Sequence, residues 1–180
     1  MIGTVSIVAA LAFVVPDTAD RAIHLEVTVP AGVEQVWRAW TTSEGIAKWF
    51  APGSHIELLV LGPYEILFNP EAAPGSRGAE DNLILAIQPM QMFSFTWDAP
   101  PNLPEVRRQR TSVVVRFYAV SPVETRVTLV QTGWGVGGEW DEAFRYFGQA
   151  WQVVLARLRY RFAVGPVDWA DPPQDLLARD

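Results

Sequence analysis

The chain has 180 residues, 49% of them hydrophobic, so it can bury one good core but has no room for two ordinary domains. Its formal net charge of −6 disfavours a nucleic-acid partner, because phosphate binding relies on a surplus of Lys and Arg. The absence of cysteine excludes disulfides, thiol nucleophiles and thiolate metal sites.

The sequence begins with an uncharged, mostly apolar run, Ile2–Val15. It is too short to span a bilayer as a helix but has the length of a signal-peptide hydrophobic region. No Lys or Arg precedes it, and no small-x-small triplet follows it directly. The pattern favours a secretory signal or an uncleaved N-terminal anchor, which predicts a periplasmic or secreted protein. The alternative is an apolar extension packed on the domain, or a start codon chosen too far upstream, in a cytoplasmic protein. We therefore treat residues 1–20 apart from a single domain at 21–165 and a tail at 166–180.

The first element of the domain is a strand at 23–29, where apolar and polar residues alternate without a fault. Pro30 ends it, and a helix begins near Gly32. The helix has four apolar positions on one face, with Glu34 and Arg38 on the other. These four are Val33, Val36, Trp37 and Trp40.

A second, short helix follows, with Thr42 or Ser43 as its cap. It carries Ile46, Trp49 and Phe50, and Pro52-Gly53 breaks it. Three tryptophans within this first helical corner provide far more apolar surface than a surface helix needs.

Six further strands are predicted. The first two, at about 54–61 and 64–69, form a hairpin across Gly62-Pro63. A loop at 70–81 separates them from strands at about 82–88 and 91–97. A stiff, proline-rich excursion at 99–104 is too dense in proline to be sheet. The last two strands lie at about 111–120 and 124–132, with a turn at Ser121-Pro122.

The final element is a long amphipathic helix from Glu139 to Phe162, which Gly165-Pro166 ends. Acidic residues lead and arginines trail, as the helix dipole favours. The tail that follows is either a strap or disordered. The apolar positions of the long helix recur at three- and four-residue steps: Trp140, Ala143, Phe144, Phe147, Trp151, Val154, Leu155, Leu158 and Phe162.

This order predicts an α+β fold in which a curved antiparallel sheet wraps around the long C-terminal helix. Consecutive antiparallel strands leave one face to be covered, and the long helix is the only predicted element able to cover it. A gap between sheet and helix is where a ligand would bind.

Several motifs also resemble a known family. They are Val33-x-x-Val-Trp-x-Ala-Trp-Thr41, Trp49-Phe-Ala-Pro52, Gly62-x-Tyr64, Phe95-Thr-Trp97, Thr125-Arg-Val-Thr-Leu129 and Trp151-x-x-Val-Leu-x-x-Leu158. Together, over residues 23–162, they resemble the activator-of-heat-shock-protein-90-ATPase homologue family of the START-related SRPBCC superfamily. The resemblance implies the helix-grip fold, and it says little about function because most of these residues are core positions. In the eukaryotic co-chaperone, the resemblance covers only the second domain, and the chaperone-binding first domain has no counterpart in this chain.

The aromatic residues of the expected cavity are the candidate ligand-binding set, with plain core filling as the alternative. A small apolar or amphipathic molecule is the expected partner, and Pro100–Pro104 is a candidate lid. The set comprises Trp40, Tyr64, Phe68, Phe93, Phe95, Trp97, Phe117, Phe147 and Trp151. The Tyr64 hydroxyl needs a hydrogen-bond partner if it is buried, from either protein or ligand.

Two other functions stay open. One is an enzyme of the polyketide-cyclase-like or hydrolase type, in which Tyr64, His55 or Asp98 moves a proton. The other is a chaperone-associated interaction domain whose acidic surface meets a partner. The sequence leaves the oligomeric state undetermined, and a membrane contact is expected only through an N-terminal anchor.

No cofactor or metal is predicted. Gly133–Gly138 contains Gly-x-Gly-x-x-Gly between a strand and a helix, but the second parallel strand of a dinucleotide site is missing. We interpret it as a flexible joint that lets the long helix fold back onto the sheet. His55 and Glu57 share a strand face without a visible third ligand. The basic cluster at Arg107, Arg108 and Arg110 is interpreted as a solvated loop.

Overall fold

The computed structural model describes residues 21–174 and 176–178, so the predicted N-terminal signal or anchor lies outside the described residues. The elements in chain order are β1 (Ile23–Val29), α1 (Val33–Thr41), α2 (Ser43–Ile46), β2 (Gly53–Ile56), β3 (Tyr64–Leu67), β4 (Gly78–Ala79), β5 (Ile84–Gln88), β6 (Met92–Trp97), α3 (Pro104–Arg107), β7 (Thr111–Ser121), β8 (Glu124–Thr132), α4 (Glu139–Ala163) and the 3-10 turn η1 (Leu176–Ala178).

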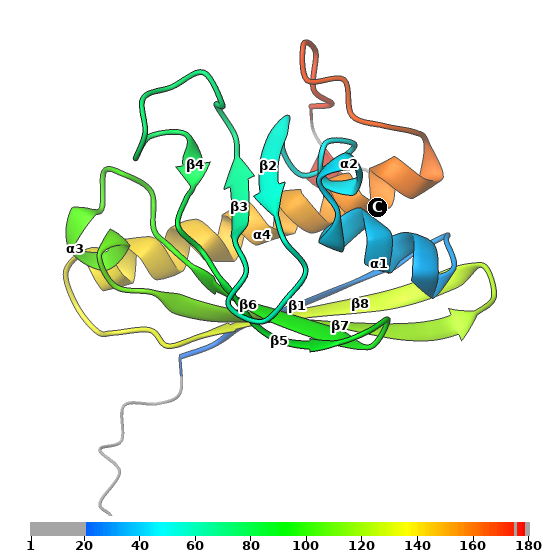
Figure 1. Cartoon of the computed structure of the whole chain (residues 1–180), viewed down its shortest axis with the longest axis horizontal. Helices are drawn as coiled ribbons and strands as arrows, with labels where there is room; N and C mark the ends of the chain where they lie inside the picture. The colour runs from blue at the N-terminus through cyan, green and yellow to red at the C-terminus, as the bar shows by residue number, and fades with distance from the viewer. Residues whose placement is uncertain (1–20, 175, 179–180) are drawn as a thin grey trace, which may run out of the picture.

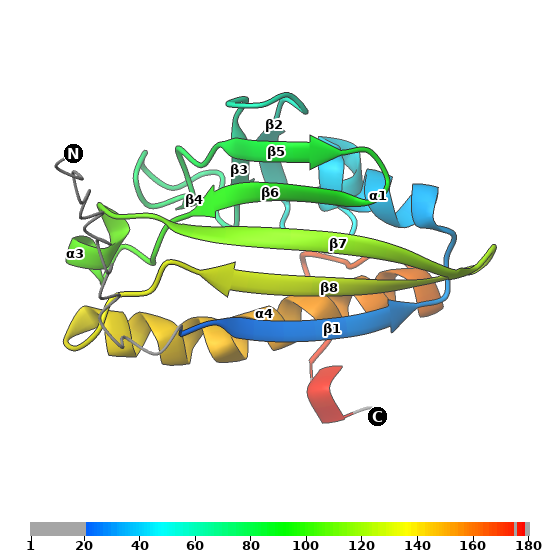
Figure 2. The ribbon, with the colours of Figure 1, turned by 90° about the horizontal axis from the view of Figure 1, so that it is seen from below.

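The predicted helix-grip architecture is confirmed. Five antiparallel strands form the large sheet in the order β1-β8-β7-β6-β5 (Figure 2). Helix α4 lies along one face of this sheet, and α1 and α2 lie on the same side (Figure 1). Among the described residues, no helix or strand packs on the other sheet face, and the outward positions of β7 and β8 are half-buried or exposed (Figure 2).

The strands β2, β3 and β4 differ from the expected single sheet, because they form a small sheet of their own on the α4 side (Figure 1). The predicted strand at 54–61 ends at Ile56, and residues 58–61 form a turn in which Leu61 has φ 64°. The turn crosses to the large sheet, where Leu61 N–H donates to the Ile84 carbonyl over 2.8 Å. The predicted loop at 70–81 contains β4, which completes the small sheet.

The core between the layers is filled by aromatic side chains. Trp40, Trp49 and Phe50 from the first helical corner are fully buried. The predicted apolar face of α1 is buried except for the half-buried Val33, so this prediction is confirmed. The Trp49 indole N–H donates to the Ala39 carbonyl at 3.0 Å, which joins the end of α2 to α1. The rings of Trp40 and Trp49 meet at 4.7 Å between centroids, a T-shaped contact of the kind aromatic pairs prefer.

The joint before α4 and the tail after it both take definite conformations. Gly133, Gly137 and Gly138 have φ of 87°, 79° and 53°, a region where glycine carries no Cβ penalty, so the chain can reverse there. After α4, Val167 N–H donates to the Lys48 carbonyl and the Trp169 indole donates to the Ala47 carbonyl. The tail is therefore a strap from the end of α4 to the end of α2. Among the described residues, none of the helices combines the length and apolar character needed to cross a bilayer.

Candidate functional site

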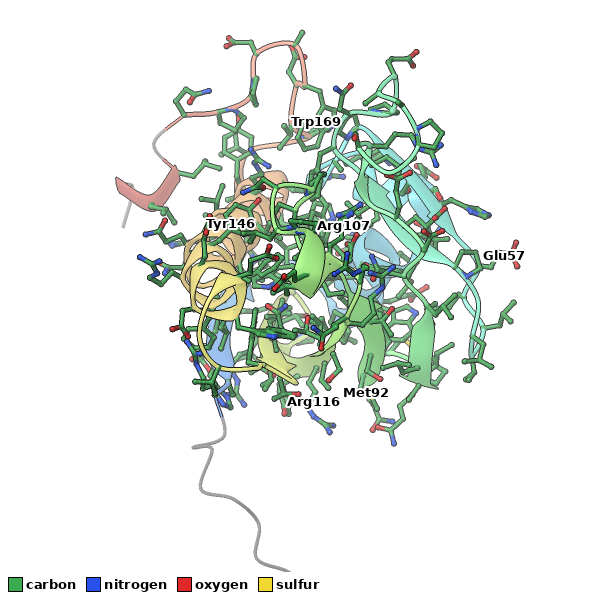
Figure 3. All side chains as sticks on the ribbon, turned by 90° about the vertical axis from the view of Figure 1, so that its left-hand side faces the viewer. Glu57, Met92, Arg107, Arg116, Tyr146 and Trp169 are labelled. Carbon is green, nitrogen blue, oxygen red and sulfur yellow. The ribbon has the colours of Figure 1, made fainter. Side chains whose placement is uncertain are left out.

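The candidate site is a hollow of about 150 Å³ at the end of the molecule that carries α3, which we call the aromatic hollow. It lies where β3, β4 and the end of β6 meet the loop before α3 and the first half of α4 (Figure 1). Its lining residues are Phe68, Gly78, Ala79, Trp97, Asp98, Ala99, Pro100, Pro101, Arg107, Tyr146, Phe147, Ala150 and Trp151. In Figure 3 this end faces the viewer, with Arg107 and Tyr146 labelled.

The inner wall of the aromatic hollow is built by Trp97, Phe147 and Trp151. Trp97 is the last residue of β6, and strand alternation puts it on the same face as Phe93 and Phe95. Phe147 and Trp151 are four residues apart on α4 and share one helical face. The ring centroids of Trp97 and Trp151 are 5.1 Å apart.

A buried chain of hydrogen bonds links the Trp151 indole to the backbone of Trp97. The Trp151 N–H donates to Gln131 Oε1 at 2.6 Å, and Gln131 Nε2 donates to the Thr111 hydroxyl at 2.8 Å. That hydroxyl in turn donates to the Trp97 carbonyl at 3.0 Å. Gln131 and Thr111 were missed by the sequence reasoning; the signal that could have found them is a polar residue at an inward position of each strand.

The outer wall carries an ion pair. Asp98, only 3% exposed, lies 2.7 Å from the guanidinium of Arg107 and accepts a hydrogen bond from Asn82 at 3.1 Å. Burial raises the pKa of Asp98, although the Asn82 hydrogen bond and the charges of Arg107 and Arg110 oppose this.

Arg107 does not belong to a solvated loop, which corrects the sequence interpretation for this residue. Its side chain is 17% exposed, and besides Asp98 it donates to the carbonyls of Gly78 at 3.1 Å and Ala99. It therefore ties the segment 98–107 to β4. Arg108 and Arg110 are exposed, as expected.

The same segment is fixed at its other end by α4. Glu139, the first residue of α4, accepts hydrogen bonds from the backbone N–H groups of Glu105 at 2.8 Å and Val106 at 3.1 Å. These are among the N–H groups that a helix start leaves without an intrahelical partner, so Glu139 caps α3 from outside. Sequence reasoning did not predict α3, because a four-residue helix has too few positions to show a period.

The predicted site residues divide into two groups. Phe68, Trp97, Phe147 and Trp151 line the aromatic hollow, as do Pro100 and Pro101 of the candidate lid. The other five are packed in the core away from it: Trp40, Tyr64, Phe93, Phe95 and Phe117.

Tyr64 shows how the core group is used. Its ring is fully buried, and its hydroxyl donates to the Trp40 carbonyl at 2.9 Å. Burial raises the pKa of Tyr64 well above its ordinary value. The partner of this hydroxyl is thus the protein, and Tyr64 ties β3 to α1.

Of the three residues considered for proton transfer, only Asp98 lines the aromatic hollow. His55 is on the exposed face of β2, with Nδ1 3.1 Å from Glu65 and Nε2 3.7 Å from Glu57. No group of three or more metal-ligating side chains occurs within residues 21–174 and 176–178.

Comparison with known proteins finds a family and a fold. A family model described as Activator of Hsp90 ATPase homolog 1-like protein matches residues 30–163. Among solved structures, the chain is similar to the Aha1 dimer from Colwellia psychrerythraea, with 18% identity, a TM-score of 0.62 and coverage of 81% of this chain and 98% of that one. It is also similar to a protein from Mesorhizobium loti, with 20% identity, a TM-score of 0.61 and coverage of 77% of this chain and 94% of that one. A third similar structure, an HSP90 activator from Plasmodium falciparum, has 15% identity, a TM-score of 0.57 and coverage of 78% of this chain and 92% of that one. No functionally curated protein matches the sequence.

Proposed function

Because the chain belongs to the family of Activator of Hsp90 ATPase homolog 1-like proteins, whose helix-grip fold it shares, we propose that it binds a small apolar or amphipathic molecule in the aromatic hollow, without catalysis. The observation that carries the proposal is the hollow itself. Aromatic rings line it on the sheet side and the α4 side, and the ionic wall of Asp98 and Arg107 gives it one polar edge. Such a mainly apolar concavity with few placed polar groups is typical of small-molecule sites.

The size of the aromatic hollow limits the ligand. Its volume of about 150 Å³ matches that of an engineered apolar protein cavity that binds benzene. The deeper space between sheet and helix is already filled by Trp40, Tyr64, Phe93 and Phe95, which are fully buried. The ligand part that enters is therefore the size of one aromatic ring or a short alkyl chain, and a long acyl chain does not fit.

A variant that fills the aromatic hollow tests the proposal without removing core packing. Ala150 lines it from α4 and is half-buried, so Ala150→Leu places a larger side chain inside. Ala156→Leu is the matched control, because Ala156 is also half-buried on α4 but borders a different groove, beside β1. Benzyl alcohol and indole are titrated by calorimetry against both variants and the wild type.

We expect saturable binding to the wild type and to Ala156→Leu, and its loss in Ala150→Leu. Native mass spectrometry of the protein purified from its own host would then identify a retained molecule. Absence of saturable binding by the wild type, together with an empty native protein, would contradict the proposal.

A second candidate function, contact with an Hsp90-type chaperone, is favoured by an exposed apolar turn. The residues Leu58, Leu59, Val60 and Leu61 are consecutive and 40% to 67% exposed. Contiguous exposed apolar surface commonly marks a protein-binding site, and one fold neighbour is described as an HSP90 activator.

Pull-down of purified Hsp90 tests this candidate. Binding by the wild type that is lost in Leu59→Ser/Val60→Ser, and retained when Val123, an exposed apolar residue outside this turn, is changed to Ser, would support it. Failure of the wild type to retain Hsp90 would exclude it.

A further inference from the structure

A second, more open hollow adjoins the first on the far side of the ionic wall. Its volume is about 560 Å³, and we call it the arginine hollow. It is lined by Gly75, Asp81, Asp98, Pro104, Arg107, Arg108 and Arg110. Asp98 and Arg107 line both hollows, so the two hollows meet at this ion pair and share it as a common edge.

The arginine hollow has a positive surplus in a chain whose net charge is −6. Three arginines face two aspartates there, and the Arg107–Asp98 pair cancels one charge of each sign. Among the lining residues, the two positive charges of Arg108 and Arg110 then face the single negative charge of Asp81. The neighbouring Arg77 does not change this balance, because its charge is cancelled by that of Glu80, which lies 2.7 Å from Arg77 and 3.9 Å from Arg107.

The two remaining guanidiniums are available for a ligand. Within the described residues, the Arg108 side chain has no hydrogen bond or ion pair. Arg110 uses Nη1 for the Arg107 carbonyl at 2.5 Å and keeps its other nitrogens. The positive charge of Arg110 also acts on the Asp98 carboxylate, whose pKa it lowers. A planar guanidinium with several donors suits a carboxylate or a phosphate better than any neutral group.

We propose that the ligand is an amphipathic anion, with an aromatic or short alkyl body in the aromatic hollow and a carboxylate or phosphate held by Arg108 and Arg110. This rests on the proposed function and adds the charge of the ligand and the residues that select it. Arg107 is not the selecting residue, because Asp98 and the carbonyls of Gly78 and Ala99 already occupy it.

Three probes with one body and different charge test the proposal: 4-phenylbutyrate, 4-phenyl-1-butanol and 4-phenylbutylamine. Their affinities are measured by calorimetry at low salt and at high salt. The variant is Arg108→Gln/Arg110→Gln. The control is Arg116→Gln, because Arg116 is exposed on β7, on the outer face of the large sheet (Figure 3).

We expect the acid to bind about fivefold more tightly than the alcohol, the upper range for one solvent-exposed ion pair, and the amine to bind most weakly. The double variant removes the acid's advantage and leaves the alcohol unchanged, whereas Arg116→Gln changes neither. Added salt reduces the advantage in the wild type, because exposed charges are screened.

The two proposals fail differently. Equal binding of acid and alcohol, or tightest binding of the amine, would overturn the anion proposal and leave the small-molecule site standing. An acid preference that survives in the double variant would overturn the assignment of Arg108 and Arg110. No saturable binding of any probe would overturn both proposals.

Discussion

At the scale of single residues, Gln131 lies at the centre of the bonds that hold the aromatic hollow in shape. It is fully buried on β8 and accepts from the Trp151 indole while it donates to Thr111. Replacing it with an apolar residue of similar size leaves the indole N–H without a partner in the core. A buried donor left unpaired costs about 1–3 kcal/mol.

Gln131→Leu is therefore expected to lower the free energy of unfolding by about 2 kcal/mol, measured by urea denaturation. Gln152→Leu is the control, because Gln152 is exposed on α4 and its side chain donates to the Gly148 carbonyl on the helix surface. A change in Gln131→Leu no larger than in this control would show that the buried chain of hydrogen bonds is not needed for stability.

Asp98 makes stability depend on pH in an unusual direction for a carboxylate in an ion pair. Because burial raises its pKa, the folded state holds the proton more tightly than the unfolded state does. Stability from this group is therefore fully present below the unfolded pKa, and is lost as pH rises from there through the folded pKa.

We expect Asp98→Asn to remove this dependence, since the amide does not titrate. Urea denaturation from about pH 3 to about pH 7, a range that spans the titration of carboxyl groups, should show the wild type losing stability relative to the variant as pH rises. A wild type that gains relative stability instead would mean that the Arg107 ion pair outweighs the desolvation of Asp98.

At the scale of elements, accuracy of prediction followed the length of the repeating pattern. The strand at 124–132 was predicted to the residue and α4 to within one, because each shows several periods of alternation or of helical spacing. The division of the sheet was missed. It depends on Leu61 crossing to Ile84, a contact between segments that no local pattern joins.

The candidate site was predictable in part for the same reason. Phe147, Trp151 and Trp97 stand at inward positions of long regular elements, so their role as wall residues could be expected. Phe93 and Phe95 have the same pattern but lie deeper, where the first helical corner fills the gap. How deeply a residue lies in the core depends on packing between elements, and the residue pattern of a single strand carries no information about that packing.

Helix α3 has only four residues, so its stability depends on its neighbours. Glu139 supplies the cap, and loss of a helix cap typically costs about 1 kcal/mol. Glu139→Ala is thus expected to speed amide hydrogen exchange at Glu105 and Val106 about fivefold, measured by NMR. Glu142→Ala, on the exposed face of α4, should not. Unchanged exchange in Glu139→Ala would mean that Arg107 alone holds the segment.

At the scale of the whole molecule, the layers are closed from outside by the tail. The strap joins the end of α4 to α2, through Val167 and Trp169 on one side and Lys48 and Ala47 on the other. The guanidinium of Arg157 on α4 also lies 5.6 Å from the Trp169 ring centroid (labelled in Figure 3), within cation–π range. Strap, α4 and the first helical corner are therefore coupled far from the aromatic hollow.

Trp169→Ala should consequently weaken the fold without emptying the site. Loss of the indole hydrogen bond and the cation–π contact is expected to lower the free energy of unfolding by about 1–2 kcal/mol, measured by thermal and urea denaturation. Affinity for 4-phenylbutyrate should stay unchanged, because no strap residue lines either hollow. The control is Val164→Ala, an exposed residue between α4 and the strap. If Trp169→Ala is as stable as that control, the strap does not contribute to the stability of the fold. If Trp169→Ala loses affinity at unchanged stability, the strap and the hollows are coupled.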